Sequence, residues 1–437
     1  MEYRTKDMNN KENIAPDERT FVDVLNSISF YKCDNVRIGD LLYYPHTLRI
    51  KDTRLNTIKK AVKRILRFAF FSNAEFEIHG TPETLFLMNN LLRRREDFQS
   101  SFRNVVELSE NNLYMYFSDK FRLNLAGLFS VTELIMWNRQ LKIVFRSVSD
   151  RMYYIGYIYE AYLEYILFEK YCRKHYLEID KLVSICDVHL TDCYFTQKFN
   201  MQNKKTITLQ HGTMCSVFNA WAFIGSHSDY FIANSRFTLS EGRIAGYKHN
   251  MIVVGLFSYV NKQKREKQFC HKIEIIGVLV DGDGFRADNL RTISTMASYC
   301  EMFNKKLLVK LHPLCDIDIY QKEFNDARIV KFVEKKKTLN QFLEMIDIAV
   351  VRNSTTLIEA IQYGVPTYIL NDKYQIADAY RNVNILKFSD EKEFHDLIDK
   401  RSLRDIYDDY TTAREYFGCA TDVTQQYKSV FASLGIS

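Results

Sequence analysis

Between residues 346 and 370, apolar and polar positions follow one another in the order typical of a strand–helix–strand unit. Two apolar runs, Ile346–Val351 and Thr367–Leu370, predict buried strands. The polar loop after the first run carries hydroxyl groups, and the amphipathic segment that follows it stops at Gly364. Hydroxyl-bearing residues often begin helices and glycine often ends them, so the pattern predicts a short helix between the two strands.

Similar alternations of strand-like and helical patterns extend over most of the chain. An amphipathic helix is expected at residues 56–71, with an apolar face and a basic opposite face. That apolar face consists of Ile58, Val62, Ile65, Leu66 and Ala69. Further helices are expected at 82–92 and 153–176, and strands at 143–146, 182–186, 205–209, 273–280 and 306–311.

A charged stretch near residue 261 divides this pattern into two α/β halves. We expect a disordered leader at 1–18, a first Rossmann-like domain at 19–260, a linker at 261–272, a second Rossmann-like domain at 273–399, and a helical segment at 400–437. Two such domains facing each other across a cleft would bind ligands at the carboxyl ends of their strands.

Composition narrows the class of protein. The net charge of +6 is compatible with an anionic substrate or an anionic membrane surface, and no nucleic-acid-binding motif is present, so no nucleic-acid partner is expected. Nine cysteines without paired spacing favour a reduced intracellular protein over a zinc or disulfide scaffold. No apolar run approaches the roughly 20 residues that cross a bilayer. A cytoplasmic protein is expected, at most peripheral to the inner face of the membrane.

Candidate chemistry in the first half lies at strand ends. His211, Gly212 and Thr213 directly follow the strand expected at 205–209. A neutral imidazole there could accept a proton from an attacking hydroxyl, and Gly212 would leave room for it. The alternative is a structural role, in which His211 bonds a neighbouring backbone group and orders the turn. Asp192, after the strand at 182–186, is a second candidate for the base.

In the second half, His312 and Pro313 follow the strand at 306–311, and a hydroxyl-rich helix start follows the strand at 346–351. That helix start consists of Asn353, Ser354, Thr355 and Thr356. Free N–H groups in the first turn of a helix attract anions, so His312 and this helix start could hold a diphosphate or a phosphodiester. Glu359 could accept hydrogen bonds from the ribose hydroxyls of a nucleotide.

Paired aspartates raise the question of a metal. Asp281 and Asp283 stand in an Asp-Gly-Asp-Gly stretch after the strand at 273–280. Such a stretch is more often a turn than a metal site, and a magnesium site would need further carboxylates nearby. We therefore expect loop contacts with the ligand at these residues, no metal and no cofactor.

The motifs together resemble those of bacterial surface-polysaccharide transferases with the GT-B fold. The resemblance covers residues 180–370 and is nearest to capsule glycosyltransferases and teichoic-acid glycerophosphotransferases, with similarity to Kdo and sialyl transferases. It rests on Gln210-His211-Gly212-Thr213, Lys310-Leu-His312-Pro313, Ser354-Thr355-Thr356, Glu359-Ala360 and Gly364-Val-Pro366. It implies that His211 is a base or acceptor-site residue. It also implies that His312, Ser354 and Thr355 bind the phosphate and nucleotide of the donor.

The chain departs from two related patterns. Teichoic-acid polymerases carry a Ser-Asp-Tyr-Ser-Ser type segment where this chain has residues 352–356, which favours sugar transfer over polyol-phosphate transfer. Nucleotide-sugar 2-epimerases usually carry Asp-Ser-Gly-Gly at the same place. The resemblance thus implies a metal-independent transferase that moves a sugar from a CMP- or UDP-linked donor to a capsule or lipopolysaccharide glycan, free or lipid-linked. A CDP-polyol phosphotransferase, an epimerase and a non-catalytic scaffold remain the alternatives.

Overall fold

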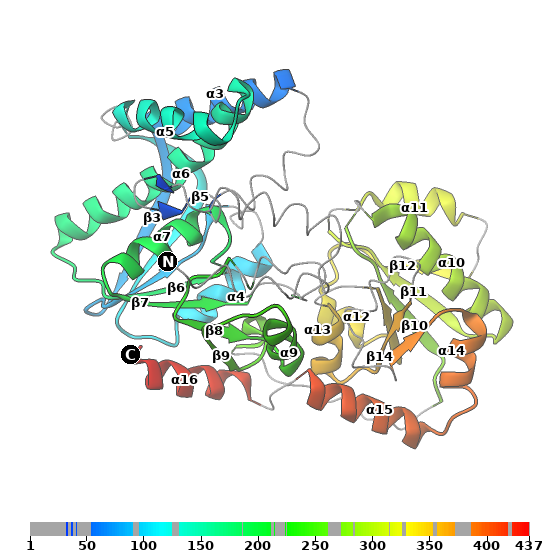
Figure 1. Cartoon of the computed structure of the whole chain (residues 1–437). Helices are drawn as coiled ribbons and strands as arrows, with labels where there is room; N and C mark the ends of the chain where they lie inside the picture. The colour runs from blue at the N-terminus through cyan, green and yellow to red at the C-terminus, as the bar shows by residue number, and fades with distance from the viewer. Residues whose placement is uncertain are drawn as a thin grey trace. The chain divides into compact units, whose positions relative to one another are not determined.

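The computed structural model divides the chain into two compact units (Figure 1). The first unit comprises residues 1–233, 238–261 and 423–437, and the second comprises residues 234–237 and 262–422. The structure describes residues 32–33, 36–37, 41, 54–90, 96–124, 131–185, 187–210, 214, 223, 225–260, 272–282, 285–313, 315–325, 329–352, 356–371, 386–417 and 422–436.

The second unit is built on a six-stranded sheet in which every neighbouring pair is parallel. Its spatial order is β12-β11-β10-β13-β14-β15. The strands are β10 (Ile275–Leu279), β11 (Lys306–Lys310), β12 (Val330–Phe332), β13 (Ile348–Val351), β14 (Thr367–Leu370) and β15 (Lys387–Phe388). This is the doubly wound order of a dinucleotide-binding fold, and the direction of winding reverses between β10 and β13.

Helices flank this sheet (Figure 1). They are α10 (Arg286–Met302), α11 (Ile317–Glu323), α12 (Leu339–Leu343), α13 (Thr356–Tyr363), α14 (Glu391–Ile398) and α15 (Leu403–Tyr416). The strand–helix–strand unit predicted near residue 350 is confirmed as β13–α13–β14. Gly364 has a φ of 99°, a conformation that glycine adopts without strain at a helix end.

The first unit contains a seven-stranded sheet in the order β3-β5-β4-β6-β7-β8-β9. Its strands are β3 (Phe71–His79), β4 (Thr84–Leu87), β5 (Asn112–Leu123), β6 (Lys181–Ile185), β7 (Lys205–Leu209), β8 (Tyr230–Ala233) and β9 (Asn250–Val253). Only the edge strand β3 is antiparallel to its neighbour. The winding reverses between β4 and β6. A short hairpin, β1 (Lys32–Cys33) with β2 (Val36–Arg37), stands apart from this sheet.

The helices of the first unit come from both ends of the chain. They are α3 (Arg54–Phe70), α4 (Glu96–Val106), α5 (Val131–Val144), α6 (Val148–His175), α7 (Leu190–Met201), α9 (Arg236–Ile244) and α16 (Val423–Leu434), with the 3-10 helix η4 (Phe257–Tyr259). α16 returns to the first unit: Tyr427 donates to the backbone oxygen of Gly255 at 3.3 Å, and Phe431 packs on Phe86. Within the described residues no helix is both long and apolar enough to cross a bilayer.

The fold class predicted from the sequence, α/β with two Rossmann-like domains, is confirmed. Two local predictions are wrong. Residues 82–92 contain the central strand β4 and not a helix, because Leu85, Phe86 and Leu87 are buried between neighbours on both sides. The strand expected at 143–146 is wrong because Ile143 and Val144 are the last residues of α5.

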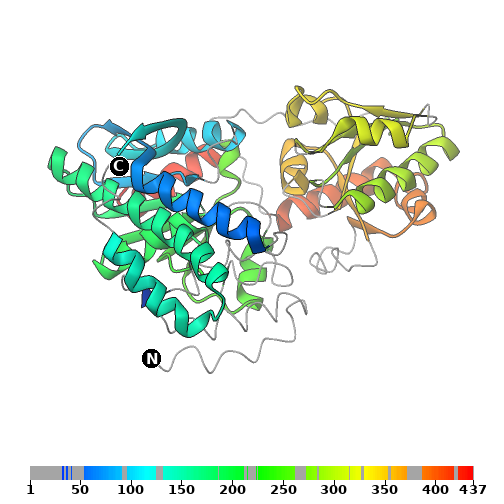
Figure 2. The ribbon, with the colours of Figure 1, turned by 90° about the horizontal axis from the view of Figure 1, so that it is seen from above.

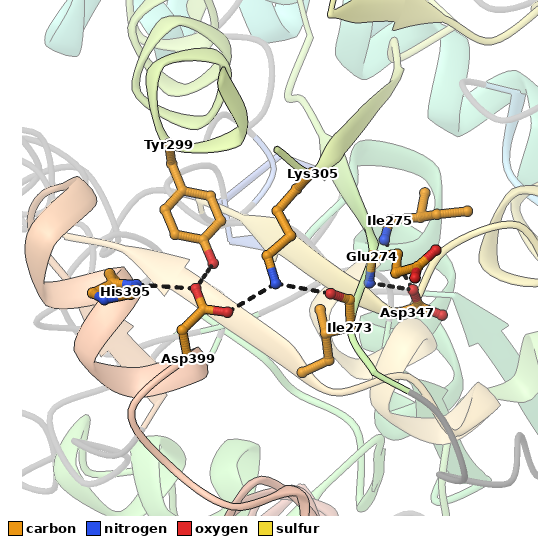
Figure 3. A network of polar contacts seen from close by, with 8 residues as sticks. All are labelled: Ile273, Glu274, Ile275, Tyr299, Lys305, Asp347, His395 and Asp399. Atoms are coloured by element: carbon orange, nitrogen blue, oxygen red, sulfur yellow. Dashed lines mark hydrogen bonds and ion pairs between the residues drawn. The ribbon is translucent and has the colours of Figure 1, made fainter. Parts of the chain in front are cut away.

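At the amino-terminal edge of the second sheet, a polar network joins three elements (Figure 3). The ammonium group of Lys305, just before β11, donates to Asp399 Oδ1 at 2.8 Å and to the backbone oxygen of Ile273 at 2.9 Å. Tyr299 of α10 donates to Asp399 Oδ2 at 2.5 Å, and His395 lies 3.0 Å from the same oxygen. The network thus fixes α10 and α14 to the start of the sheet.

Candidate functional site

Arg352 is the central charged side chain at the switch point of the second unit. It directly follows β13, and its side chain is only 4% exposed. Its Nη1 lies 2.8 Å from Asp288 Oδ2 in the first turn of α10, and its Nε lies 3.9 Å from Asp281 Oδ2 after β10. A buried guanidinium needs such partners because desolvation of an unpaired charge is costly. Arg352 therefore joins the two strand ends that border the switch point.

A phenyl ring stands beside this guanidinium. Phe285, which precedes α10, is 50% exposed, and the guanidinium carbon of Arg352 lies 4.9 Å from the centre of its ring. A cation over an aromatic face is attracted by the ring quadrupole, which orients both groups. The switch point thus presents an exposed flat ring next to a buried cation.

The loop after β10 is held in place by α10. Asn289 is buried and exchanges hydrogen bonds with the backbone of Asp281: its Oδ1 accepts from the amide at 3.1 Å, and its Nδ2 donates to the carbonyl at 2.8 Å. Nδ2 also donates to the Tyr320 hydroxyl at 3.1 Å. This pairing keeps Asp281 at the strand end, where its carboxylate faces Arg352.

His312 lies beside the same loop, as its position at a strand end predicts. It follows β11 by two residues and is half-buried, and Pro313 next to it is exposed. A β-carbon built on Gly282 would lie 3.7 Å from His312 Nδ1, so the ring approaches the backbone of the β10 loop closely. The structure therefore brings His312 and Asp281 to one edge of the sheet.

A further cation lies on β11. Lys310 donates to the backbone oxygen of Lys337 at 2.6 Å. Burial lowers the pKa of its ammonium group, because the charged form loses hydration there. Together with Arg352 and His312, Lys310 makes this part of the second unit rich in groups that attract anions.

The helix start predicted to bind phosphate begins at Thr356. Thr356 is the first residue of α13, and Glu359 lies in its first turn; both are partly exposed. Asn353, Ser354 and Thr355, which complete the predicted site, lie outside the described residues, as does Asp283. The first turn of α13 follows β13 and therefore stands at the same edge as Arg352.

In the first unit, Asp192 lies in the first turn of α7 and is fully buried. Asn89, just after β4, donates to Asp192 Oδ2 at 2.6 Å, and its Nδ2 is 3.3 Å from His189 Nδ1. Asp192 Oδ1 is buried and accepts no hydrogen bond from any described residue. Burial raises the pKa of Asp192 well above its usual range, with further contributions from Asp187 and Glu164.

A second buried carboxyl lies nearby. Glu164 of α6 accepts from Thr191 at 2.6 Å and from Asn90 at 3.3 Å. Burial, followed by the neighbouring charge of Glu160, raises its pKa well above the usual range. Glu160 in turn forms an ion pair with Arg64. Carboxyls of α6 and α7 and amides of the residues after β4 therefore collect around the switch point of the first unit.

Asp187, which follows β6 by two residues, holds a neighbouring turn in place. Its Oδ2 accepts from the hydroxyl of Ser226 at 2.7 Å and from the amides of His227 and Ser228 at 2.8 Å each. The hydroxyl of Ser228 adds a fourth bond at 2.8 Å. This carboxylate organises the turn that leads into β8.

His211, Gly212 and Thr213, the other part of the predicted site in the first unit, lie outside the described residues. They follow β7, the strand next to β6. Among the residues that the structure describes, no group of three or more His, Cys, Asp or Glu side chains could hold a metal ion.

Sequence reasoning missed several residues at the two switch points. Arg352 begins the segment 352–356 that the sequence comparison considered, but its role depends on pairing with Asp288, which is distant in sequence. Phe285 and Asn89 likewise become candidates for the site only through their contacts with Arg352 and Asp192. A polar residue within two positions of the end of a buried strand is a signal that could have identified Arg352 and Asn89 in advance.

No protein-family model matches the chain, and no curated protein matches its sequence. Solved structures do match at low identity. MnaA from S. aureus, solved with UDP, is 11% identical, with a TM-score of 0.48 over 82% of this chain and 98% of that one. A UDP-glucose:anthocyanidin 3-O-glucosyltransferase in complex with UDP is 8% identical, with a TM-score of 0.46 over 82% of this chain and all of the other (100%).

The wall teichoic acid polymerase TagF also matches, at 12% identity and a TM-score of 0.39. That alignment covers 66% of this chain and 74% of TagF. The similar structures thus include a glucosyltransferase and a polymerase. Similarity at this level does not specify a donor or an acceptor.

Proposed function

We propose that the protein is a GT-B glycosyltransferase that moves a sugar from a nucleotide-sugar donor to a glycan. The observation that carries the proposal is the anion-attracting edge of the second unit. There a buried guanidinium, an imidazole and the start of α13 follow strands of one doubly wound sheet, at or next to its switch point. Such a combination suits the diphosphate or phosphodiester of a nucleotide sugar.

In this proposal His312 and the start of α13, with Asn353, Ser354, Thr355 and Thr356, bind the phosphate of the donor and offset charge on it as it departs. Glu359 accepts hydrogen bonds from the ribose hydroxyls. Asp281, which faces Arg352, and Asp283 contact the ligand through their loop. The donor is CMP- or UDP-linked, and transfer needs no metal.

The first unit would bind the acceptor, a growing capsule or lipopolysaccharide glycan that is free or lipid-linked. Buried carboxyls and amides near β4 and β6 suit the hydroxyl groups of a sugar, which both donate and accept hydrogen bonds. We assign the base to His211. Asp192 is fully buried and has a raised pKa, so it fits a positioning role better.

Calorimetric titration with CMP, CDP and UDP tests the donor site. His312→Ala should weaken binding of the preferred nucleotide about 10- to 150-fold, because a hydrogen bond to a charged group contributes about 1.5–3 kcal/mol. His79→Ala is the matched control, since His79 is half exposed on β3 of the first unit. Equal affinities in both variants and the wild type would remove His312 from the donor site.

A further inference from the structure

The helix α3 carries a row of apolar side chains on the surface of the first unit. Ile58, Val62, Leu66 and Phe70 are spaced by four residues and are 37%, 40%, 54% and 36% exposed. Residues at this spacing lie on one face of a helix, so they form a continuous strip, here called the apolar row. The sequence predicts Ile58, Val62 and Leu66 on the apolar face of an amphipathic helix, and in the structure these three side chains are exposed.

A second row runs beside the first. Lys59, Lys63 and Arg67 are also spaced by four residues, and with the apolar row and Phe71 they line one shallow depression in the surface. This is the basic row. Residues 54–70 contain no acidic side chain, so no carboxylate within α3 neutralises it.

The opposite face of α3 is fixed against α6, as Figure 2 shows with the two helices side by side. Ala61 and Phe68 are buried, and a β-carbon on Gly156 of α6 would lie only 3.4 Å from the backbone oxygen of Ala61. Arg64 lies over the ring of Tyr157, with 3.6 Å from its guanidinium carbon to the ring centre. The helix cannot rotate to bury the apolar row without losing these contacts.

We propose that the apolar row and the basic row form a docking surface for an anionic lipid bilayer. The apolar row is about 18 Å long at 1.5 Å per residue, and it is one side chain wide. Helices that lie in the membrane interface combine such a strip with lysines and arginines. The strip enters the acyl boundary, and the ammonium groups of Lys59 and Lys63 remain at the level of the phosphate groups, since their long stems reach past the apolar surface. Arg67, whose guanidinium lies over the ring of Phe121, adds positive charge beside them.

Charge decides between a bilayer and other occupants. A bilayer with anionic headgroups offers negative charge along the whole basic row while accepting the apolar row next to it. A nucleic acid would use the cations and leave the apolar row in water. A second copy of this chain would bring two basic rows together, which is unfavourable. The inference does not depend on the proposed sugar transfer.

Sedimentation of the full chain with phosphatidylcholine vesicles, with and without phosphatidylglycerol, tests the inference. The wild type should bind only the anionic vesicles. Lys59→Gln with Lys63→Gln should weaken binding about fivefold for each lysine removed, and added salt should act in the same direction. Leu66→Ser with Phe70→Ser should weaken it about tenfold through lost apolar burial.

Ile135→Ser with Met136→Ser is the matched control, since these residues of α5 are 53% and 43% exposed. It should bind as the wild type does. Failure of the wild type to bind anionic vesicles would overturn the inference. Loss of vesicle binding in the lysine variant without any loss in the Leu66→Ser, Phe70→Ser variant would also overturn it. The same holds if the control loses as much binding as the variants of α3. Light scattering adds a last check: a wild-type dimer that Leu66→Ser with Phe70→Ser dissociates would assign the surface to a second copy instead.

Discussion

Arg352 connects more parts of the second unit than any other side chain described at its switch point. It pairs with Asp288 and Asp281 and lies against Phe285, so one guanidinium orders the ends of β10 and β13 and the start of α10. A planar fork with several donors can serve two carboxylates and a ring at once, whereas an ammonium group is a single point charge.

Arg352→Lys should therefore weaken nucleotide binding as well as stability. We expect a loss of about 1–3 kcal/mol in the free energy of unfolding, because the half-buried carboxylates of Asp288 and Asp281 lose the paired donors of the guanidinium. Arg401→Lys is the matched control, since Arg401 also forms two bonds to a carboxylate, that of Asp409, at 2.5 and 3.2 Å. Thermal melts and nucleotide titrations of both variants distinguish the roles. Unchanged nucleotide affinity in Arg352→Lys would make Arg352 a purely structural residue.

At the scale of single elements, the pattern of apolar residues predicted most of the parallel strands and the unit β13–α13–β14. The pattern failed at β4, because a short, mostly apolar stretch is compatible with either a buried strand or a helix. It also grouped Ile58, Val62 and Leu66 on one apolar face, which the structure leaves exposed. Periodicity shows that a helix has an apolar face, but only the packing of Ala61 and Phe68 shows which face is buried.

The candidate site was predictable to a similar extent. Strand ends followed by polar residues identified His312 and Asp281, and the structure brings both to one edge. The pairs Arg352–Asp288 and Asn89–Asp192 could not be predicted from one sequence, since each joins residues that are far apart along the chain. The raised pKa of Asp192 follows from burial, which spacing alone does not reveal.

The network around Asp399 makes a prediction at this same scale. Burial opposes the charged form, but hydrogen bonds from Lys305, Tyr299 and His395 outweigh it and lower the pKa of Asp399. A carboxyl with a lowered folded-state pKa stabilises the fold above its unfolded pKa, near 3.9, and this contribution is lost as the pH falls through the folded value. Asp399→Asn should remove the part of the free energy of unfolding that is lost in acid.

At neutral pH, Asp399→Asn should lower the free energy of unfolding, because the buried ammonium group of Lys305 loses its charged partner. The expected loss is only about 1–2 kcal/mol, because Asp399 itself is partly exposed and solvent weakens the pair. Asp396→Asn is the control: Asp396 pairs with Lys400 on the surface and should matter little. Chemical denaturation between acid and neutral pH measures both. An Asp399→Asn variant with the same acid dependence as the wild type would contradict this account.

At the scale of the whole molecule, the two units share a fold class but differ in the chemistry of their switch points. The second unit offers a guanidinium, an imidazole and an ammonium group, which suit an anionic donor. The first offers carboxyls and amides, which suit the hydroxyl groups of an acceptor. This division of charge is the physical basis for placing the donor in one unit and the acceptor in the other.

The most direct test of the central claim is phosphorus NMR of nucleotide release from CMP- and UDP-sugars, with a glycan acceptor and excess EDTA. We expect release of the nucleotide to depend on the acceptor and to survive the chelator. His211→Ala should slow release about 10²- to 10⁴-fold and Asp192→Asn less, as general-base catalysis predicts. Consumption of CDP-glycerol in place of nucleotide sugars, epimerisation of the donor without transfer, or no consumption of any nucleotide sugar would contradict the claim.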